Sequence, residues 1–301
     1  MKTLGIILSA GKSSRLYPAT LSVTKQLLPI YDKPLVFFPL SLLMLARVRD
    51  MNLIVNPMEI KTFGRLIEQS RLDKACTFRI HPQMKPTGIP DAFKIIGTNI
   101  PADTLLHYDN VCLILGDNIF HGASMTGIIQ DACKDTKNAH IFGAKVKDLH
   151  RFGVVSRLND DHDSIVIEEK PTFIECPARS SAITGLYVFP TDVFTQVEGL
   201  KPSARGETEI TDLIRIYERQ HRLTIHDLPR GVTWFDTGTA DALLDAAQYV
   251  RAVQVNQGLL VGSPHEVAYH QGWLDISDLD DYLKHDSKSD YAEKLMEMID
   301  G

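Results

Sequence analysis

Small residues and an arginine follow the first apolar run of the chain. The stretch SAGKSSR, residues 9–15, comes directly after the run GIIL and ends at Arg15. Small side chains let backbone N–H groups approach phosphate oxygens closely, and Lys12 and Arg15 add positive charge. The stretch contains neither GxxxxGK[ST] nor GxGxxG, so it matches no P-loop or dinucleotide fingerprint. By itself it leaves a phosphate-binding loop and an ordinary surface turn equally open.

A second cation, Lys25, lies ten residues beyond Arg15, within VTKQLLPIYDKP. A lysine just before an apolar stretch usually lies at a solvated edge of the fold. The functional alternative is a cation that reaches the same phosphates as Arg15. We keep both interpretations at this point.

Two aspartates follow strand-like runs, Asp117 in VCLILGDNIF and Asp236 in WFDTGT. A carboxylate at the end of a central strand is well placed to hold a divalent cation, because hard cations prefer oxygen ligands. A turn built on Asp117 and Asn118 is the alternative without a ligand. If the two carboxylates converge, they can hold one Mg²⁺ on a triphosphate. The sequence therefore predicts a magnesium site at Asp117 and Asp236.

The segment IEEKP places Glu169 and Lys170 at the end of another expected strand. Surface charge is the usual explanation for such a run. Beside a polyphosphate site, Lys170 could instead bind a second anionic substrate, and Glu169 could bind hydroxyl groups. The chain has no HExxH pattern and no nucleophile elbow. These observations favour direct transfer between two bound substrates over a covalent intermediate.

Apolar runs and helical periods alternate through the first half, as a wound α/β fold requires. The expected strands are residues 4–9, 52–56, 77–81, 111–115 and 139–145. The expected helices are residues 35–49, 58–72, 90–98 and 123–134. The pattern predicts a Rossmann-like, mostly parallel central sheet with helices on both faces.

From Phe152 the segments FGVVSRL, SIVIEEK and AITGLYVF predict extra strands added to the sheet. Residues 207–220 are expected to be helical, and RLTIHDL to be a strand. After Thr239 the pattern is helical to the end. We therefore expect an α/β core, with these extra strands, over residues 1–239. A helical region over residues 240–301, used for assembly or regulation, is not expected to be independent.

Composition narrows the class of protein. The 301-residue chain is 44% hydrophobic and 23% charged, and it carries a net charge of −6. This balance argues against a nucleic acid or an anionic membrane bound by bulk electrostatics. The four cysteines form no CxxC pair, which argues against a zinc site or a disulfide framework. We expect a cytoplasmic protein with incidental thiols.

The motifs taken together resemble the sugar-nucleotide pyrophosphorylases, and most closely the bacterial glucose-1-phosphate thymidylyltransferases. The resemblance covers essentially the whole chain. It rests on SRLYPAT, KQLLPIYDKPL, LILGDNIFHG, RFGVV, EEKP, ITGLYVF, LKPSARGETEITDLIRIY and FDTGT, which occur in the family's order. The resemblance implies a Mg²⁺-dependent reaction of a nucleoside triphosphate with a sugar 1-phosphate, and a homo-oligomer, either a tetramer or a dimer.

The resemblance also implies roles for individual residues. Arg15 would contact the departing pyrophosphate and Lys25 the α-phosphate, while Asp117 and Asp236 would bind the metal. The nucleotide-binding residues would be Ala10, Gly11, Ser13, Ser14, Gln26, Gln83 and Gly88. The sugar-phosphate pocket would comprise Leu115, Gly153, Glu169, Lys170 and Ile183. The reaction expected first is thymidylyl transfer from dTTP to α-D-glucose 1-phosphate, with in-line attack and release of pyrophosphate.

Three segments depart from the family pattern. The loop AGGSGTR appears here as SAGKSSR, so Ser13 stands where a glycine with positive φ is expected. The base-side segment QMKPTGIPDAF carries Thr87, Pro90 and Asp91 at changed positions. Tyr269 and His270 replace residues of a region linked to feedback binding. The alternatives are transfer from UTP or to another sugar 1-phosphate, and a catalytically degenerate paralogue that only binds sugar nucleotide.

Overall fold

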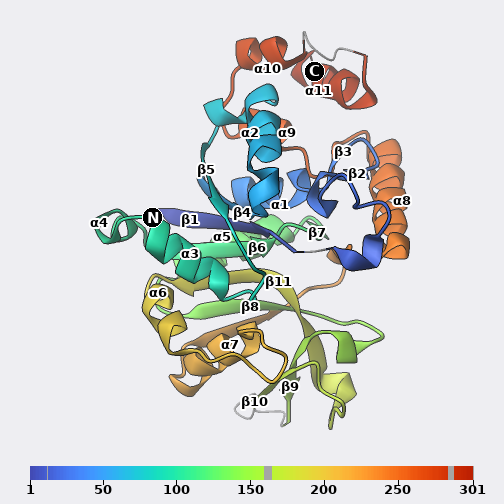
Figure 1. The fold of residues 1–301 in the computed structure, drawn as a ribbon. Helices are drawn as coiled ribbons and strands as arrows, with labels where there is room; N and C mark the ends of the chain where they lie inside the picture. Colours follow the sequence, from blue (N-terminus) through green and yellow to red (C-terminus); the bar gives the residue numbers. More distant parts are fainter. Residues whose placement is uncertain (12, 159–164, 284–287, 301) are drawn as a thin grey trace. The chain divides into compact units, whose positions relative to one another are not determined.

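The computed structural model describes residues 1–11, 13–158, 165–283 and 288–300 (Figure 1). Lys12, which was expected with Arg15 to add positive charge to the phosphate loop, lies outside these ranges. The chain divides into two compact units. Unit 1 comprises residues 1–3, 85–114 and 122–234, and unit 2 comprises residues 4–84, 115–121 and 235–301.

Unit 2 contains a parallel sheet in which β4 (Asp50–Val55) lies between β1 (Thr3–Ser9) and β5 (Thr77–Pro82). Leu53 of β4 faces Ile7 of β1 and Ile80 of β5 in the register. Residues 4–7 of β1 are all buried. Such continuous burial is typical of a parallel strand that is covered on both faces, and it explains the run LGII.

The helices of unit 2 lie partly beside this sheet and partly farther from it, toward the C-terminus (Figure 1). They are α1 (Phe37–Leu45), α2 (Ile60–Gln69), α8 (Ala240–Gln257), α9 (Pro264–His270), α10 (Ile276–Leu283) and α11 (Asp290–Asp300). Nearly every residue of α1 is buried, as its apolar sequence FFPLSLLML requires, and α1 packs on α9. Thr239 caps the start of α8, and Gly258, with φ 69°, ends it.

Short elements connect these helices and strands. In unit 2 they are η1 (Ser14–Leu16), η2 (Lys25–Leu27), β2 (Pro29–Ile30), β3 (Lys33–Pro34), η3 (Pro57–Glu59), η4 (Leu72–Lys74) and β7 (Asn118–His121). The strand β13 (Thr233–Asp236) runs across the boundary between the units along the chain. The elements η1, η2 and the end of β13 carry candidate site residues.

Unit 1 is built around β11 (Ser180–Pro190), whose residues are all buried. β11 pairs antiparallel with β6 (Asn110–Leu115), β8 (Ala139–Ala144) and β9 (Gly153–Arg157). β10 (Ile165–Glu169) pairs antiparallel with β9, and β12 (Leu223–Asp227) pairs parallel with β8. The strands β9, β10, β11 and β12 are the extra strands that the sequence predicts after Phe152.

The helix α7 (Ile210–Arg219) packs against β10 and β12 of unit 1. The remaining helical elements of the unit are α3 (Asp91–Asn99), α4 (Ala102–Leu105), α5 (Met125–Lys134), α6 (Val193–Gln196), η5 (Leu149–Arg151), η6 (Pro177–Arg179) and η7 (Val197–Gly199). Most of the expected helices and strands occur within a few residues of the predicted bounds.

The predicted fold class is confirmed: the protein is an α/β protein with a mostly parallel central sheet, added strands and C-terminal helices. The predicted division at residue 240 stays a prediction. Residues 235–301 are part of unit 2, together with residues 4–84. Within the described ranges, no helix has both the length and the apolar character needed to cross a membrane.

Candidate active site

The loop after β1 turns at Ser13, whose φ of 49° and ψ of 31° are left-handed. The carbonyl of Ser13 accepts hydrogen bonds from the Leu16 N–H at 3.0 Å and the Thr20 hydroxyl at 3.2 Å. A side chain in this backbone region adds about 1–2 kcal/mol of strain, which glycine avoids. The family pattern has a glycine at this position, and the left-handed backbone of Ser13 gives the steric reason for that glycine.

The rest of this loop leaves open space. Ala10 is buried, whereas Gly11, Ser14 and Arg15 are exposed. A Cβ atom built on Gly11 meets nothing within 4 Å, and the φ of Gly11 is not left-handed. Nothing in the described structure therefore requires a glycine at this position. A ligand that approaches the backbone closely would require one.

Arg15 and Asp236 both lie against Gly238. A Cβ built on Gly238 would lie 2.7 Å from a terminal nitrogen of Arg15 and 3.4 Å from Oδ1 of Asp236. The Arg15 guanidinium therefore lies closer to Gly238 than a Cβ would allow, whereas the Asp236 oxygen lies at an ordinary contact distance. Unit 2 thus brings together the arginine and the second carboxylate, which are far apart in the sequence.

Lys25 forms an ion pair with Oδ2 of Asp117, and only 7% of the Lys25 side chain and 20% of the Asp117 side chain are exposed. The Asp117 carbonyl accepts hydrogen bonds from the Thr237 N–H at 3.2 Å and the Thr237 hydroxyl at 2.7 Å. Thr237, itself fully buried, directly follows Asp236. These bonds tie the chain at Asp117 to the turn that carries Asp236.

This arrangement fits a magnesium ion. Asp117 and Asp236 supply hard carboxylate oxygens from two segments that Thr237 holds together. The described residues contain no group of three or more His, Cys, Asp or Glu that could hold a metal ion. Mg²⁺ usually binds through one or two carboxylates, with substrate phosphates and water completing its shell. A pair of aspartates beside a phosphate loop therefore suffices.

The remaining nucleotide candidates of unit 2 are Gln26 and Gln83. Gln26 is buried, and its Oε1 accepts a hydrogen bond of 2.7 Å from the Thr24 hydroxyl. Gln83, also buried, continues β5 through a backbone bond to Val55 of 2.8 Å. Leu115, which was expected in the sugar-phosphate pocket, is half-buried at the end of β6 and belongs to unit 2.

Gly88, in unit 1, is required by the protein itself. Its φ is 117°, and a Cβ there would lie 2.0 Å from the carbonyl oxygen of Thr208. The Thr208 N–H donates to the Thr87 carbonyl at 2.7 Å. The base-side segment is therefore fastened to the segment that carries LKPSARGETEITD, and Gly88 makes that approach sterically feasible.

Unit 1 gathers the sugar-side candidates at the start of β9 and the end of β10. A Cβ on Gly153 would lie 3.3 Å from Oε2 of Glu169 and 3.6 Å from Cδ1 of Ile183. Thr211, at the start of α7, donates a hydrogen bond of 3.3 Å to the same Glu169 oxygen. Gly153, Glu169 and Ile183, which are distant in sequence, thus surround one point of unit 1.

Lys170 adds a cation at this point. Its backbone is left-handed, with φ 45°, and its N–H donates to the Phe152 carbonyl at 3.0 Å. The Lys170 side chain is 46% exposed, and Nζ lies 3.7 Å from Oε1 of Glu169. The backbone turn directs an exposed amine toward the carboxylate that the sequence predicts for hydroxyl binding.

Sequence reasoning missed Arg205 as a site residue. Its terminal nitrogen donates to Glu169 at 3.1 Å and to Glu209 at 2.7 Å, and its Nε donates to Glu209 at 3.2 Å. The Ser203 hydroxyl donates to the same Glu209 carboxylate at 2.6 Å. Hydrogen bonding to Glu209 raises the pKa of Arg205 above its usual value, so its charge is permanent.

A cavity of about 370 Å³ in unit 1 is lined by Glu169, Ser203, Arg205 and Glu209, together with Glu168, Asp212 and Arg215. The signal in the sequence was the spacing of Arg205 and Glu209, four residues apart in ARGETE. Thr237 and Gly238 were also missed, because only the structure shows them against Asp117 and Arg15.

Known proteins are similar to this chain over most of its length. The family model for nucleotidyl transferases matches residues 4–253. A glucose-1-phosphate thymidylyltransferase of Neisseria gonorrhoeae is 42% identical over 295 residues, which cover 98% of this chain and 99% of that protein. One of Mycobacterium tuberculosis is 39% identical over 297 residues, again 98% and 99% of the two chains.

Solved structures are similar to it as well. A Bacillus anthracis protein assigned as a glucose-1-phosphate thymidylyltransferase, crystallised with sucrose, matches with a TM-score of 0.71 and 31% identity. The match covers 83% of this chain and 95% of that one. A UDP-glucose pyrophosphorylase bound to UDP-glucose has a TM-score of 0.69 at 19% identity, over 84% and 99% of the two chains, and shares the fold.

The chain therefore belongs to the nucleotidyl transferase family. Its relatives at about 40% identity are glucose-1-phosphate thymidylyltransferases over nearly their full length. The resemblance stated from the sequence motifs is thus confirmed.

Proposed function

We propose that the protein transfers thymidylate from dTTP to α-D-glucose 1-phosphate, giving dTDP-glucose and pyrophosphate. The observation that carries this proposal is the cluster in unit 2, where Lys25 pairs with Asp117 and Thr237 links Asp117 to the turn at Asp236. Full-length relatives with this activity in their names support the choice of substrates.

The donor nucleotide takes the residues of unit 2. Backbone N–H groups of the loop at Gly11 bind the triphosphate, and Arg15 neutralises the charge that develops on the departing pyrophosphate. Lys25 holds the α-phosphate, for which it must leave or share Asp117. Gln26 and Gln83 line the side of the base.

In this proposal Asp117 and Asp236 would hold Mg²⁺, which would supply positive charge against the phosphates of the bound nucleotide. Lys25 balances the charge of the Asp117 carboxylate, whose side chain is 20% exposed. When the nucleotide binds, its α-phosphate offers the Lys25 amine a second anion.

The acceptor takes the residues of unit 1. Lys170 binds the phosphate of the sugar, Glu169 accepts hydrogen bonds from its hydroxyls, and Gly153 leaves room for the ring beside Ile183. Arg205 adds a second cation near this phosphate. The acceptor oxygen then attacks the α-phosphorus in line. The protein supplies alignment and charge but no nucleophile.

One experiment tests the proposal directly. Pyrophosphate release is measured with Mg²⁺ across dTTP, UTP, CTP, ATP and GTP, each with a panel of sugar 1-phosphates. We expect the highest kcat/KM with dTTP and glucose 1-phosphate. A different preferred pair would keep the mechanism and move the specificity, which the changed residues Thr87, Pro90 and Asp91 make a real outcome.

A second candidate is a paralogue that binds sugar nucleotide without turnover, and the strained backbone at Ser13 favours it. The variant Ser13→Gly separates the two candidates. A rise from near zero to a normal rate would support the binder, whereas a parent protein with full activity would exclude it. The two aspartates, Asp117 and Asp236, support the enzyme, because they are the residues that would hold the metal of a transfer reaction.

We also propose a cytoplasmic homo-oligomer. Leu244 and Val255 of α8 and the nearby Leu259 are each more than half exposed. Exposed apolar side chains along one helix are a common feature of subunit contacts. Light scattering of the full chain measures the number of subunits, and a monomer at micromolar concentration would contradict this part of the proposal.

A further inference from the structure

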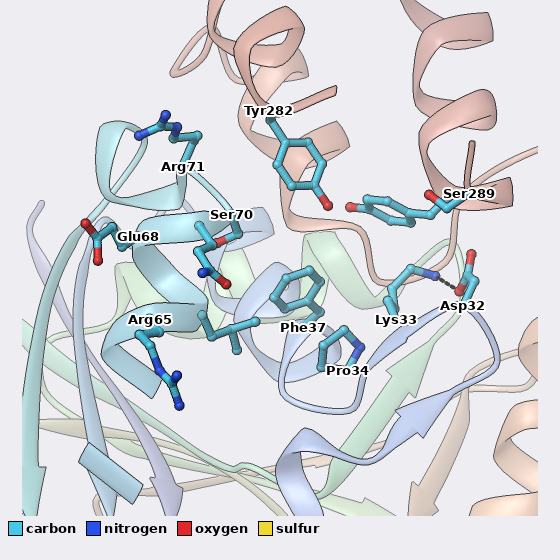
Figure 2. Close-up of a pocket in the computed structure, with 13 residues that line it drawn as sticks. Asp32, Lys33, Pro34, Phe37, Arg65, Glu68, Ser70, Arg71, Tyr282 and Ser289 are labelled. Atoms are coloured by element: carbon cyan, nitrogen blue, oxygen red, sulfur yellow. Dashed lines mark hydrogen bonds and ion pairs between the residues drawn. The ribbon is translucent and has the colours of Figure 1, made fainter. Parts of the chain in front are cut away.

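A second and larger cavity lies within unit 2, with a volume of about 850 Å³ (Figure 2). Its walls come from the segment leading into α1, from the last turns of α2, and from α10 and α11. The residues that matter here are Pro34, Phe37, Arg65, Arg71, Tyr282 and Tyr291. No residue that we assign to the nucleotide, the metal or the sugar phosphate lines it.

One wall of this cavity is aromatic and held rigidly. The ring of Tyr282 stacks on His265, with centroids 4.1 Å apart and an interplanar angle of 16°. Nε2 of His265 donates to the Ser70 carbonyl at 2.8 Å, so Nδ1 accepts from the Tyr291 hydroxyl at 2.7 Å. Burial lowers the pKa of His265 to about 4, which keeps the ring neutral. Tyr282 and Tyr291 therefore form a fixed surface.

Of the cations that the structure describes in the lining, only Arg65 has no ion-pair partner among the described residues. Lys33 pairs with Asp32 and donates to Gln254 at 2.9 Å, and Arg71 pairs with Asp281 at 3.2 Å. Arg65 is exposed at the cavity (Figure 2) and forms no ion pair with any residue that the structure describes, its neighbour Glu68 included. An anionic group entering the cavity can therefore pair with Arg65.

We propose that this cavity is a second ligand site, for a small organic anion that carries a ring. The ring lies against Phe37 and Tyr282, and the anionic group pairs with Arg65. The volume is within the range of about 300–1,000 Å³ that small-molecule sites occupy. Its lining combines the aromatic rings of Phe37, Tyr282 and Tyr291 with five charged side chains, Asp32, Lys33, Arg65, Glu68 and Arg71.

A short hydrogen-bonded stretch connects the cavity to the segment that carries Lys25. Pro34 and Phe37, in its floor, follow directly on the segment that begins at Lys25. The Val36 N–H donates to the Gln26 carbonyl at 2.9 Å, and the Leu35 N–H donates to the Leu28 carbonyl at 3.0 Å. A ligand that moves Pro34 or Phe37 therefore also moves Lys25. We infer that occupancy changes the rate of turnover, a step that rests on the proposed function.

Binding is tested first, on the full chain, by calorimetry with phenyl phosphate, which combines one ring with one anion. Benzyl alcohol and inorganic phosphate each lack one of the two features and serve as control ligands. We expect phenyl phosphate to bind one site at least tenfold more tightly than either control. Equal binding of all three, or no binding of phenyl phosphate, would overturn the proposal.

Three variants locate the probe. Arg65→Gln removes the cation of the cavity and should weaken phenyl phosphate at least fivefold. Lys61→Gln, a matched change at another exposed position of α2, should leave the affinity unchanged. Arg15→Gln, in the phosphate loop, should also leave it unchanged. Weakening by Arg15→Gln but not by Arg65→Gln would show that the probe binds the phosphate loop, and the proposed site would be wrong.

The effect on turnover is measured next, as pyrophosphate release with and without saturating phenyl phosphate. We expect at least a twofold change in the parent protein and in Lys61→Gln, and none in Arg65→Gln. An unchanged rate in the parent protein with the site filled would refute the coupling to Lys25. Calorimetry needs no turnover, so a failure of the proposed function leaves the binding result interpretable.

Discussion

At the scale of single residues, Ser13 and Gly11 show opposite reasons for a small side chain. Ser13 has the left-handed backbone that glycine adopts most readily, yet it is not a glycine. Gly11 has an ordinary backbone and open space around it, yet it is one. The protein tolerates strain at the first position and leaves room at the second. Two predictions follow from this contrast.

The variant Ser13→Gly should stabilise the protein. Removing Cβ relieves about 1 kcal/mol of strain at a φ of 49°, less the entropy that glycine adds to the unfolded chain. Urea denaturation measures the change. Ser14→Gly, inside η1, is the control and should destabilise by roughly 0.5–1 kcal/mol. Destabilisation by both substitutions would argue against strain at Ser13.

The variant Gly11→Ala should lower the rate of pyrophosphate release at least tenfold, with the free energy of unfolding unchanged within about 0.5 kcal/mol. The added methyl group meets no described protein atom within 4 Å, so only a ligand can clash with it. Gly127→Ala, in α5 and equally open, should retain full activity. Normal turnover in Gly11→Ala would remove the loop from the phosphate site.

At the scale of elements, the segment from Ser203 to Glu209 acts as a support. The Glu209 carboxylate receives hydrogen bonds from Ser203 and Arg205, and the backbone of Thr208 meets Thr87 and Gly88. One short segment therefore orients a cation on one side and braces the base-side segment on the other. Glu209 is a positioning residue, because it acts through Arg205.

The variant Glu209→Gln should raise KM for glucose 1-phosphate roughly tenfold, because a hydrogen bond between charged groups contributes about 1.5–3 kcal/mol. The KM for dTTP should change by less than a factor of about two, since the Thr208 backbone contacts remain. Initial rates at varied concentrations of each substrate give both constants. Glu207→Gln, at an exposed position two residues away, is the control. Equal rises in both KM values would indicate general loss of structure instead.

The sequence predicted the helices and strands better than the contacts between residues that are distant along the chain. Buried runs such as VCLIL and the capped helix after Thr239 follow from local pattern, and both occur as expected. The steric demand at Ser13 was also predicted, because the family pattern that the chain resembles has a glycine at this position. The contact of Arg15 with Gly238 was not, since it joins residues more than 200 positions apart. No periodicity or spacing within one chain encodes such a distance.

At the scale of the whole molecule, a carboxylate in unit 2 makes stability depend on pH. Burial raises the pKa of Glu266 to about 7, and the positive charge of Lys33 offsets this only in part. The folded protein therefore binds this proton more tightly than the unfolded chain does. Its stabilising effect is complete below about pH 4.5 and is lost as the pH rises through about 7.

Between pH 5 and pH 8 the parent protein should therefore lose about 1–3 kcal/mol more stability than Glu266→Gln, which cannot ionise. Urea midpoints at the two pH values measure the difference. His265, whose pKa burial lowers to about 4, acts in the opposite sense, because its stabilising effect is lost as the pH falls below about 6.5. It is present in both proteins, so it cancels in the comparison. Parallel pH profiles would contradict the assignment to Glu266.

The composition of unit 2 has a consequence for biosynthesis. The unit is assembled from residues 4–84, 115–121 and 235–301, and Asp236 lies at the start of the last of these segments. A ribosome that adds about 5–20 residues per second releases Asp236 at least ~10 s after Arg15. Asp117 is added partway through that interval, so the nascent chain then carries the proposed phosphate loop and Asp117 without Asp236. The proposed metal-binding pair is therefore complete only after residues 118–236 have also been added.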